Sequence, residues 1–542
     1  MILYHASTLY HSLCCLVHKL AFHPREEAEL LLVEYMFRGD EMEAFIQKLN
    51  SYGWFTRIRV VPESRLAENS RKKLTLSSSA REIENTAKKI SDGVMEWLGH
   101  DLREYDEINL LAEQWSLGIA VLYQRIPNNF FEDGSGLLGD EGRYFRIVKE
   151  ISMKNYVLLK YLKGGGNNSF TKVKYCDMRN QPPGFYDSKA ADFNIPHLIS
   201  EKIPDKVEQL LELYHGKKIT TGGEKKMVLF MTQFIRTLTV QNFAVQEKMT
   251  AVLWDYFVPE ETLLVVKPHP KDCYIDYRKI APECVVLDRR LPSELLPFVF
   301  DRPVQLVLTA SSTSTGGVSG ITEEVMQFTP DIESHFYRLP VYYAISRMVE
   351  ALYRGQDICI CQKGRPYVEN LLTIHGRKEI LQSHGSQIRL WVDPEPGSGD
   401  VEQDIYIFSD SSRCFLYQKE FSAENWMICE VYMEEKTGRK SKCDIYLYCK
   451  DGEIRKEMKR MKEEKELLYS GNRLEMVICE ASQLQIEKGK QKALLYALRE
   501  KEKESQDKVL LEMNTIIDSY YKKEALLENM LADDGWRGEY IE

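Results

Sequence analysis

The stretch TLLVVKPHPKD at residues 262–272 constrains the fold of this chain more than any other feature. Its first five residues form an apolar run rich in β-branched side chains, which predicts a buried strand. Pro268 and Pro270 end that strand, because proline fixes φ and has no backbone N–H to donate. The strand therefore delivers His269 onto a rigid loop at its carboxyl end, the edge where ligands bind in open α/β sheets.

Lys267 and Lys271 flank His269 on this loop. An imidazole between two ammonium groups is suited to binding a phosphate, because all three groups donate hydrogen bonds and favour negative charge nearby. The alternative is a structural histidine in a proline-stiffened turn. Taken alone, the loop is compatible with either interpretation.

The chain has 542 residues, more than one hydrophobic core usually supports, so we expect two or three domains. A net charge of −10 argues against a general nucleic-acid binder. The twelve cysteines have no regular spacing, which excludes a secreted disulfide framework and fits a reducing cytoplasm. Cys359 and Cys361 lack further ligands at zinc spacing and are expected to be small buried residues of a strand.

The apolar segment 9–22 is interrupted by His11, His18 and Lys19, so it resembles neither a signal peptide nor a membrane span. We expect a cytoplasmic protein, and peripheral attachment to the inner face of the membrane stays open. The lysine pairs at 217–218 and 225–226 suit either an anionic lipid or glycan, or a solvated linker.

Residues 1–135 alternate strands with helices. The patterns predict strands at 2–5, 29–36, 54–61, 107–112 and 128–131, and helices at 9–22, 79–97 and 117–125. Such alternation indicates a parallel sheet with helices on both faces. One further helix is expected at 145–163. The glycine loop at 164–168, the proline-bearing segment 181–204 and a helix at 204–215 then resemble a connection between domains.

A second α/β unit follows. The patterns predict strands at 227–233, 262–266, 284–288 and 304–309, and helices at 241–257, from Pro292 onward, and after the SSTSTGG loop to about Phe328. Two Rossmann-like units in tandem, facing across a cleft, define the GT-B architecture. That α/β fold class is our prediction.

Beyond about residue 355 the pattern changes. Residues 356–450 carry short alternating runs, which predict an antiparallel β module, and 451–532 read as helical. We therefore expect four segments: 1–215 with its linker, 216–350, a β-rich accessory module at 351–450, and a helical tail at 451–542.

Three loops at predicted strand ends carry the candidate chemistry, and the first begins Glu132-Asp133-Gly134. Adjacent side chains cannot both point into one pocket, so one carboxylate is chemical and its neighbour structural. A hydroxyl that attacks a sugar needs a base for its proton, and we assign Asp133 to that task. The alternative is a plain polar turn, since Asp-Gly is a common turn pair.

The second loop is Lys267-Pro268-His269-Pro270, where a cationic imidazole would stabilise a departing phosphate. The third, 311–317, gathers hydroxyls and small residues before an expected helix. A helix N-terminus offers unpaired N–H groups to a phosphate, although a simple Ser/Thr N-cap is the alternative.

Together, in this order, the loops resemble the motifs of bacterial sialyltransferases and polysialyltransferases. The D/E-D/E-G motif is matched at 132–134, the HP motif at 269–270 and the serine/threonine motif at 311–314. Two softer matches are Ser7-Thr8-Leu9-Tyr10-His11 and the LPSELL run at 291–296. The resemblance covers roughly residues 1–345 and offers nothing for the long C-terminal extension.

The resemblance implies an inverting, metal-independent transferase that moves sialic acid from CMP-sialic acid to a glycan hydroxyl, as in capsule polysaccharide biosynthesis. The first Rossmann-like domain would then face the acceptor and the second would bind the nucleotide sugar. Asp133 matches the general base beside Glu132, and His269 matches the residue that contacts the CMP phosphate. The predicted donor- and phosphate-binding residues are Lys267, His269, Pro270, Ser311, Ser312, Thr313, Ser314, Gln233 and Glu294.

Beyond the CMP-sugar substrate, no cofactor and no divalent metal is expected, because no D-x-D follows a strand. The alternatives are a Kdo or polyol-phosphate transferase with a CMP or CDP donor in the same fold, and a non-catalytic glycan-binding protein that works through its β module.

Overall fold

The computed structural model describes residues 1–499 apart from the following gaps: 38–39, 69–72, 133–137, 221–225, 233–242, 259–260, 271, 273–274, 310–316, 319, 328–338, 353–357, 362–364, 375–376, 382–387, 396, 410–420, 436–437, 439, 461–466, 470–471 and 496. The chain divides into two compact units, one of residues 1–247 with 261–330 and one of residues 248–260 with 331–542. The four-segment division made from the sequence stays a prediction.

The first unit begins with a seven-stranded parallel sheet in the order β3-β2-β1-β4-β5-β6-β7. Its strands are β1 (Ile2–Ala6), β2 (Ala28–Val33), β3 (Arg57–Val61), β4 (Glu107–Leu110), β5 (Asn128–Phe131), β6 (Thr171–Cys176) and β7 (Ala190–Asp192). The order reverses between β1 and β4, which is the Rossmann topology and makes the carboxyl ends of these two strands the expected ligand edge.

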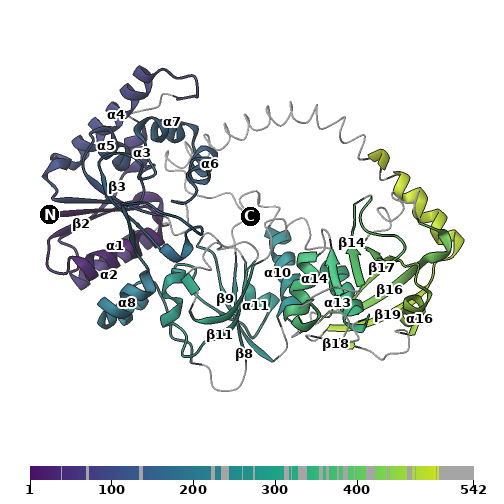
Figure 1. The fold of residues 1–542 in the computed structure, drawn as a ribbon. Helices are drawn as coiled ribbons and strands as arrows, with labels where there is room; N and C mark the ends of the chain where they lie inside the picture. The colour runs from purple at the N-terminus through teal and green to yellow at the C-terminus, as the bar shows by residue number, and fades with distance from the viewer. Residues whose placement is uncertain are drawn as a thin grey trace, which may run out of the picture. The chain divides into compact units, whose positions relative to one another are not determined.

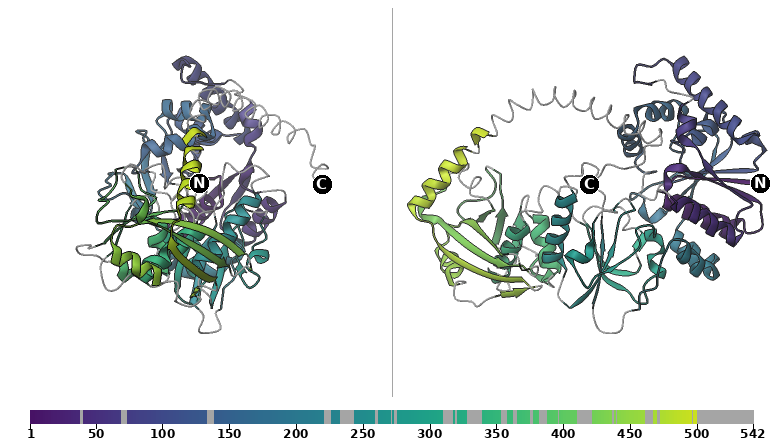
Figure 2. Two further views of the ribbon diagram at one scale, coloured as in Figure 1. Left: turned by 90° about the vertical axis from the view of Figure 1, so that its right-hand side faces the viewer. Right: turned by 180° about the vertical axis from the view of Figure 1, so that it is seen from behind.

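Helices cover both faces of this sheet (Figures 1 and 2). They are α1 (Leu9–Phe22), α2 (Glu41–Tyr52), α3 (Glu63–Glu68), α4 (Ala80–Leu98), α5 (Ser116–Tyr123), α6 (Glu141–Ile151), α7 (Met153–Leu162), α8 (Ile195–Lys202) and α9 (Val207–Leu213). One core packs α1, α2, α8 and α9 on one face, and another packs α4, α5 and α7 on the other. The expected parallel sheet with two covered faces is confirmed.

Two expectations for this region are wrong. The single helix expected at 145–163 is two helices, α6 and α7, because the Ser152 side chain caps α7 by accepting the N–H of Asn155 at 3.2 Å. The segment expected to be a plain connection contains β6 and β7, which extend the sheet beside β5. Their short runs of mixed polarity carry little strand signal, and pairing with β5 decides their conformation.

The second sheet of this unit is also parallel, in the order β10-β9-β8-β11-β12. Its elements are β8 (Lys226–Met231), α10 (Phe243–Phe257), β9 (Thr262–Lys267), α11 (Tyr277–Ile280), β10 (Val285–Val286), β11 (Val304–Thr309) and β12 (Thr322–Gln327). The 3₁₀ segment η6 (Ser293–Phe298) lies between β10 and β11. Most of α10, from residue 248, belongs to the second unit.

The helix expected after the SSTSTGG loop is wrong in the described residues. Residues 317–318 form part of a 3₁₀ turn, and 322–327 form β12, which pairs in parallel with β11. Good helix formers there adopt a strand because β11 offers an unpaired edge. The helix N-terminus that this loop was expected to present to a phosphate is therefore not formed by the described part of 317–327.

The two sheets share one hydrophobic core, which runs from Leu13 and Leu16 of α1 through Tyr214 to Leu229 and Leu291. Within it the hydroxyls of Ser12 and Tyr214 lie 2.7 Å apart. Two Rossmann-like sheets in tandem are the GT-B architecture, so the predicted fold class is confirmed.

The second unit holds a seven-stranded mixed sheet in the order β13-β14-β15-β17-β16-β19-β18. Its strands are β13 (Ile358–Cys361), β14 (Ile388–Val392), β15 (Ile405–Phe408), β16 (Trp426–Glu434), β17 (Lys440–Tyr448), β18 (Leu467–Tyr469) and β19 (Asn472–Glu480). Its helices are α13 (Leu339–Leu352), α14 (Arg365–Ile374) and α16 (Gly452–Arg460), and residues 483–495 are helical.

The β-rich module is confirmed, including the strand around Cys359 and Cys361, but two of its details are wrong. The sheet is mixed and not antiparallel throughout, since β13, β14 and β15 pair in parallel. The tail is not helical throughout, since β18 and β19 lie within it and β19 pairs with β16. A nine-residue partner strand outweighs the helix-forming composition of that segment.

The remaining short 3₁₀ segments are η1 (Glu34–Met36), η2 (Leu102–Glu104), η3 (Met178–Asn180), η4 (Pro204–Lys206), η9 (Lys378–Leu381) and η11 (Ala423–Asn425). Among the helices in the described part of the chain, none is both long and apolar enough to cross a membrane.

Candidate functional site

The loop after β9 is held by hydrogen bonds to its backbone. Thr232, which follows β8, accepts the backbone N–H of His269 on its hydroxyl at 2.9 Å and donates that hydroxyl to Asp272 at 3.1 Å. The Asp272 N–H closes the turn on the His269 carbonyl at 2.8 Å, and the Tyr277 hydroxyl also donates to the Asp272 carboxylate. The HP turn is therefore clamped from the neighbouring strand, and the half-buried His269 stands at the carboxyl end of β9.

Lys267, the last residue of β9, stabilises this turn. Its side chain is buried, and its ammonium donates to the carbonyl of Pro268 at 2.6 Å and to that of Arg289 at 3.3 Å. Burial lowers the pKa of Lys267 to about 8, although the carboxylates of Asp288 and Glu294 oppose the shift. The geometry makes Lys267 a support of the loop, since its ammonium binds one backbone carbonyl of the turn and one of the segment after β10.

Arg289 and Arg290 follow β10 and reach the first sheet's helices. Arg289 donates to the carbonyl of Pro270 at 3.0 Å and to the Glu41 carboxylate at 2.6 Å. Arg290 forms a two-pronged pair with Asp288, at 2.9 and 2.8 Å, and lies 3.5 Å from Glu41. Glu41 begins α2, so these ion pairs connect the HP loop directly to the first Rossmann-like domain.

Glu294 lies at the start of η6, next to the end of the third loop. A Cβ on Gly317 would lie 3.2 Å from the backbone N of Glu294 and 3.3 Å from its carboxylate. The chain therefore leaves the SSTSTGG motif in contact with η6, and the charge of Glu294 acts on buried Lys267. Three of the predicted regions therefore lie close together: the HP loop, Glu294 and the end of the SSTSTGG loop.

Glu132 follows β5 and is buried. Its carboxylate accepts the backbone N–H of Leu138 at 2.8 Å and the side-chain amide of Gln181 at 2.6 Å. These contacts suit the structural member of the carboxylate pair, since they tie the two ends of the intervening loop. Asp133 lies outside the described residues, and its role as base stays a prediction.

Other predicted site residues also fall outside the described part of the chain: Gln233, Lys271, Ser311, Ser312, Thr313 and Ser314. Their roles stay predictions as well. Among the predicted residues that the structure describes, Lys267, His269, Pro270 and Glu294 lie on the second sheet, and Glu132 lies on the first.

The early motif at 7–11 forms the entry to α1, at the carboxyl end of β1. Thr8 is the N-cap, its hydroxyl accepting the N–H of His11 at 3.1 Å, and the Ser7 hydroxyl lies 3.1 Å from Nδ1 of the His11 ring. The motif therefore sits at the reversal of strand order in the first sheet, where a Rossmann-like fold places its ligands.

Glu113 follows β4 on the other side of that reversal. It is buried and accepts the N–H groups of Gly165 and Gly166, whose positive φ of 75° and 70° lets both point at one carboxylate. Burial nevertheless raises the pKa of Glu113 to about 7. The Gly164-Gly165-Gly166 loop is thus part of the sheet's ligand edge and not only a connection.

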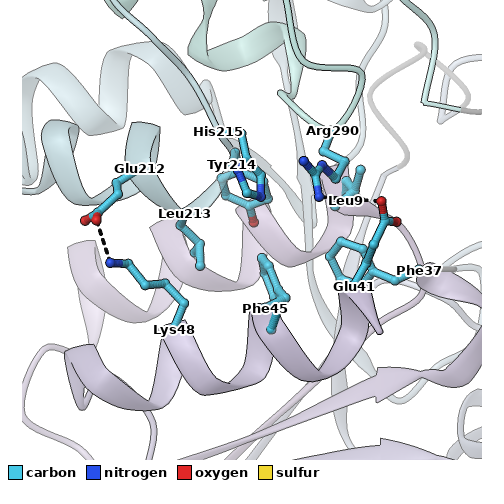
Figure 3. A pocket seen from close by; sticks show the side chains of 11 residues that line it. Leu9, Phe37, Glu41, Phe45, Lys48, Glu212, Leu213, Tyr214, His215 and Arg290 are labelled. Atoms are coloured by element: carbon cyan, nitrogen blue, oxygen red, sulfur yellow. Dashed lines mark hydrogen bonds and ion pairs between the residues drawn. The ribbon is translucent and has the colours of Figure 1, made fainter. Parts of the chain in front are cut away.

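A cavity of about 380 Å³ is lined by residues of α1, α2 and the end of α9, together with Arg290 of the second Rossmann-like domain (Figure 3). Leu9, Phe45 and Tyr214 form its apolar wall, and Glu41 with Arg290 closes one end. At the other end Lys48 pairs with Glu212 at 2.5 Å. The cavity therefore has an apolar wall with charged groups at its two ends, the mixed lining typical of small-molecule pockets.

Sequence reasoning missed Thr232, Asp272, Arg289 and Glu41. Arg289 had a readable signal, since two adjacent arginines follow a predicted strand in the unit that carries the HP loop. Thr232 and Asp272 had no such signal. Thr232 is far from His269 in the sequence, and the contact of Asp272 with His269 depends on the conformation of the turn. In the sequence, Glu41 is an ordinary glutamate of a first helical turn. Its contacts with Arg289 and Arg290 arise only from the tertiary structure.

No protein-family model matches this chain, and neither does any curated protein. Solved structures with a similar arrangement include a spinosyn rhamnosyltransferase, 12% identical with a TM-score of 0.34, which covers 70% of this chain and 92% of that one. A UDP-GlcNAc 2-epimerase from Neisseria meningitidis bound to UDP-GlcNAc is 11% identical with a TM-score of 0.34, covering 68% and 94%.

The GT-B domain of a sialyltransferase from Photobacterium damselae is 12% identical with a TM-score of 0.32, covering 72% of this chain and all of that domain (100%). At these scores the fold assignment rests on the strand orders of the two sheets and not on the neighbours.

Proposed function

We propose that this protein is a glycosyltransferase that moves a sugar from a CMP-activated donor to a glycan hydroxyl. The observation that carries the proposal is the clamped HP loop. Its backbone groups are bound by Thr232, Lys267 and Arg289, which holds the His269 ring at the carboxyl end of β9. A rigid loop rich in cations, at the ligand edge of a Rossmann-like sheet, suits a phosphate that gains charge as its glycosyl bond breaks.

In the proposed reaction the acceptor hydroxyl oxygen attacks the anomeric carbon as the bond to the CMP phosphate breaks. Asp133 takes the hydroxyl proton, and attack from the face opposite the leaving group inverts the anomeric configuration. His269 stabilises the charge that develops on the phosphate, with the field of Lys267 behind it. Glu132, bound to Leu138 and Gln181, holds the loop from which Asp133 acts.

The motif resemblance supports sialic acid as the transferred sugar and a surface polysaccharide or lipid-linked glycan as the acceptor. Kdo on the same nucleotide is the competing donor, because the proposed role of the HP loop concerns the phosphate of the donor and not its sugar. CMP is the leaving group of both donors. We place the reaction in the cytoplasm, and we propose that it needs no divalent metal.

Calorimetric titration with CMP, CDP and UDP, each with and without EDTA, tests the nucleotide part of the proposal. We expect CMP to bind most tightly, with no effect of EDTA. His269→Ala should weaken CMP binding about 10- to 100-fold, the effect of losing one hydrogen bond to a charged group. His197→Ala, which removes an exposed imidazole from α8, is the matched control and should bind CMP normally.

Donor hydrolysis then separates the two sugars, since CMP-sialic acid and CMP-Kdo are compared with the same enzyme. Absence of binding to any of the three nucleotides would overturn the transferase proposal and favour a non-catalytic glycan-binding protein. CMP affinity equal in wild type and His269→Ala would remove His269 from the phosphate site.

A further inference from the structure

Three side chains with metal-binding atoms converge at the amino end of β4. His18 belongs to α1, His23 directly follows that helix, and Glu107 is the first residue of β4. Each offers one nitrogen or carboxylate oxygen, and these three atoms lie within 4.8 Å of one another. The nearest measured pair, Nε2 of His23 and Oε1 of Glu107, is separated by 3.7 Å.

His18 has a buried nitrogen without a hydrogen-bond partner. Its ring is fully buried, Nδ1 lies 2.9 Å from the hydroxyl of Tyr4, and Nε2 has no partner. Aromatic rings, among them Phe131 and Tyr175, surround it at centroid distances of 5.2 and 4.9 Å. Buried polar atoms are nearly always paired in folded proteins, so an orphaned imidazole nitrogen calls for a ligand.

Each of the three side chains also lies next to a further polar group. In the neutral tautomer with its proton on Nδ1, His18 donates to the Tyr4 hydroxyl 2.9 Å away, and Nε2 carries the lone pair that a metal ion requires. On His23, Nδ1 lies 3.9 Å from the Glu26 carboxylate, while Nε2 faces Glu107 at 3.7 Å. Glu107 accepts the side-chain amide of Asn109 at 2.8 Å. Imidazoles and carboxylates that bind metals have such outer partners.

We propose that His18, His23 and Glu107 bind a divalent transition metal ion, zinc by the nature of the ligands, with a water molecule as the fourth ligand. Metal–ligand bonds of about 2.0–2.2 Å place neighbouring ligands about 3.4 Å apart in a tetrahedron, close to the 3.7 Å measured for His23 and Glu107. Two imidazoles and one carboxylate form a set that zinc accepts readily.

The proposed ion has a structural role. It joins the end of α1 to the amino end of β4, two elements of one Rossmann-like sheet that lie far apart in the sequence. The loops of the proposed transferase site lie at the carboxyl ends of strands, the opposite edge, so this ion takes no part in the transfer. The proposal is therefore independent of the proposed function.

The test is zinc binding to the full-length protein. Wild type, His23→Ala and Glu107→Gln are stripped with chelator, titrated with zinc chloride in a calorimeter, and measured for bound zinc by mass spectrometry. The two substituted side chains are partly exposed, which favours folded variants. His197→Ala is the matched control, because it removes an imidazole outside the cluster.

We expect about one zinc ion per chain in wild type and in His197→Ala, and affinity lowered at least tenfold in the other two variants. Zinc should raise the melting temperature of wild type but not of His23→Ala, and cobalt should give the visible absorption of a tetrahedral site. Failure of wild type to bind zinc saturably would overturn the proposal and leave a histidine–glutamate ion pair. Equal loss in His197→Ala would indicate binding by surface imidazoles and would overturn it as well.

Discussion

Arg289 donates to a carboxylate oxygen of Glu41 at 2.6 Å, and the same guanidinium donates to the carbonyl of Pro270 at 3.0 Å. One side chain thus binds the HP loop of the second Rossmann-like domain and the first turn of α2 in the first. Both partners are about three-quarters buried, with 24% and 26% of their side-chain surfaces exposed. The position of the HP loop therefore depends on how the two domains pack.

Arg289→Ala is expected to lower kcat/KM for the sugar donor about tenfold, because it removes a charge-assisted hydrogen bond to the loop that carries His269. The free energy of unfolding should change by about 1 kcal/mol or less, the usual contribution of a partly exposed ion pair. Steady-state kinetics and urea unfolding measure the two quantities. Lys88→Ala is the matched control, since it breaks an exposed ion pair of 2.6 Å on α4. Equal kinetics for both variants would contradict the positioning role of Arg289.

Asp133→Asn is expected to lower kcat about 10²- to 10⁴-fold, because the amide cannot accept the proton of the acceptor hydroxyl. The affinity for CMP should stay within twofold of wild type. Glu132→Gln keeps an acceptor for the N–H of Leu138 and should cost no more than about tenfold. If the Glu132 variant proved the less active of the two, the chemical and structural roles would have to be exchanged.

CMP affinity is expected to fall as the pH rises through about 8. Burial lowers the pKa of Lys267 to about 8, so its positive charge is present below that pH and lost above it. The neutral amine still donates to Pro268 and Arg289, so the loop keeps its geometry while the field on the phosphate weakens. Calorimetry from pH 7 to 9 measures the effect. In Lys267→Met this decline should be absent, and an unchanged decline would assign it to another group.

Glu113 is expected to make the protein less stable as the pH rises from about 4.5 to 7. Its pKa is about 7 in the folded protein and 4.5 in its ordinary state, so between these values the folded chain holds a proton that the unfolded chain has lost. Stability from this group is complete below 4.5 and is lost as the pH rises to 7. Glu113→Gln, which stays uncharged, should gain about 3 kcal/mol relative to wild type between pH 4.5 and 8.

Urea unfolding at several pH values measures this difference. Glu84→Gln, a change at an exposed position of α4, is the control and should follow wild type at each pH. A constant difference between wild type and Glu113→Gln across the range would show that Glu113 keeps its charge when folded.

The strand order of the first 130 residues and helices α1, α4 and α5 were predictable because periodicity and β-branched runs are local, whereas helices α2 and α3 were not predicted. The strand at β9 and the prolines after it are local in the same sense, so the position of His269 at a strand end was predictable. The helix expected before Phe328 was wrong because β12 depends on an edge offered by β11, which is not a property of residues 322–327. Strands β6, β18 and β19 were missed for the same reason.

The sequence by itself determined two parallel α/β sheets, a β-rich extension and a histidine on a proline-stiffened loop at the end of a buried strand. Only the tertiary structure decided which groups hold that loop, since Thr232, Arg289 and Glu41 reach it from other strands and from the other domain. The same holds for the proposed metal site, where His18 and Glu107 meet only when α1 packs on the sheet that contains β4. Hydrogen bonds and metal–ligand bonds act over a few ångströms, so they are decided by packing and not by the order of residues along the chain.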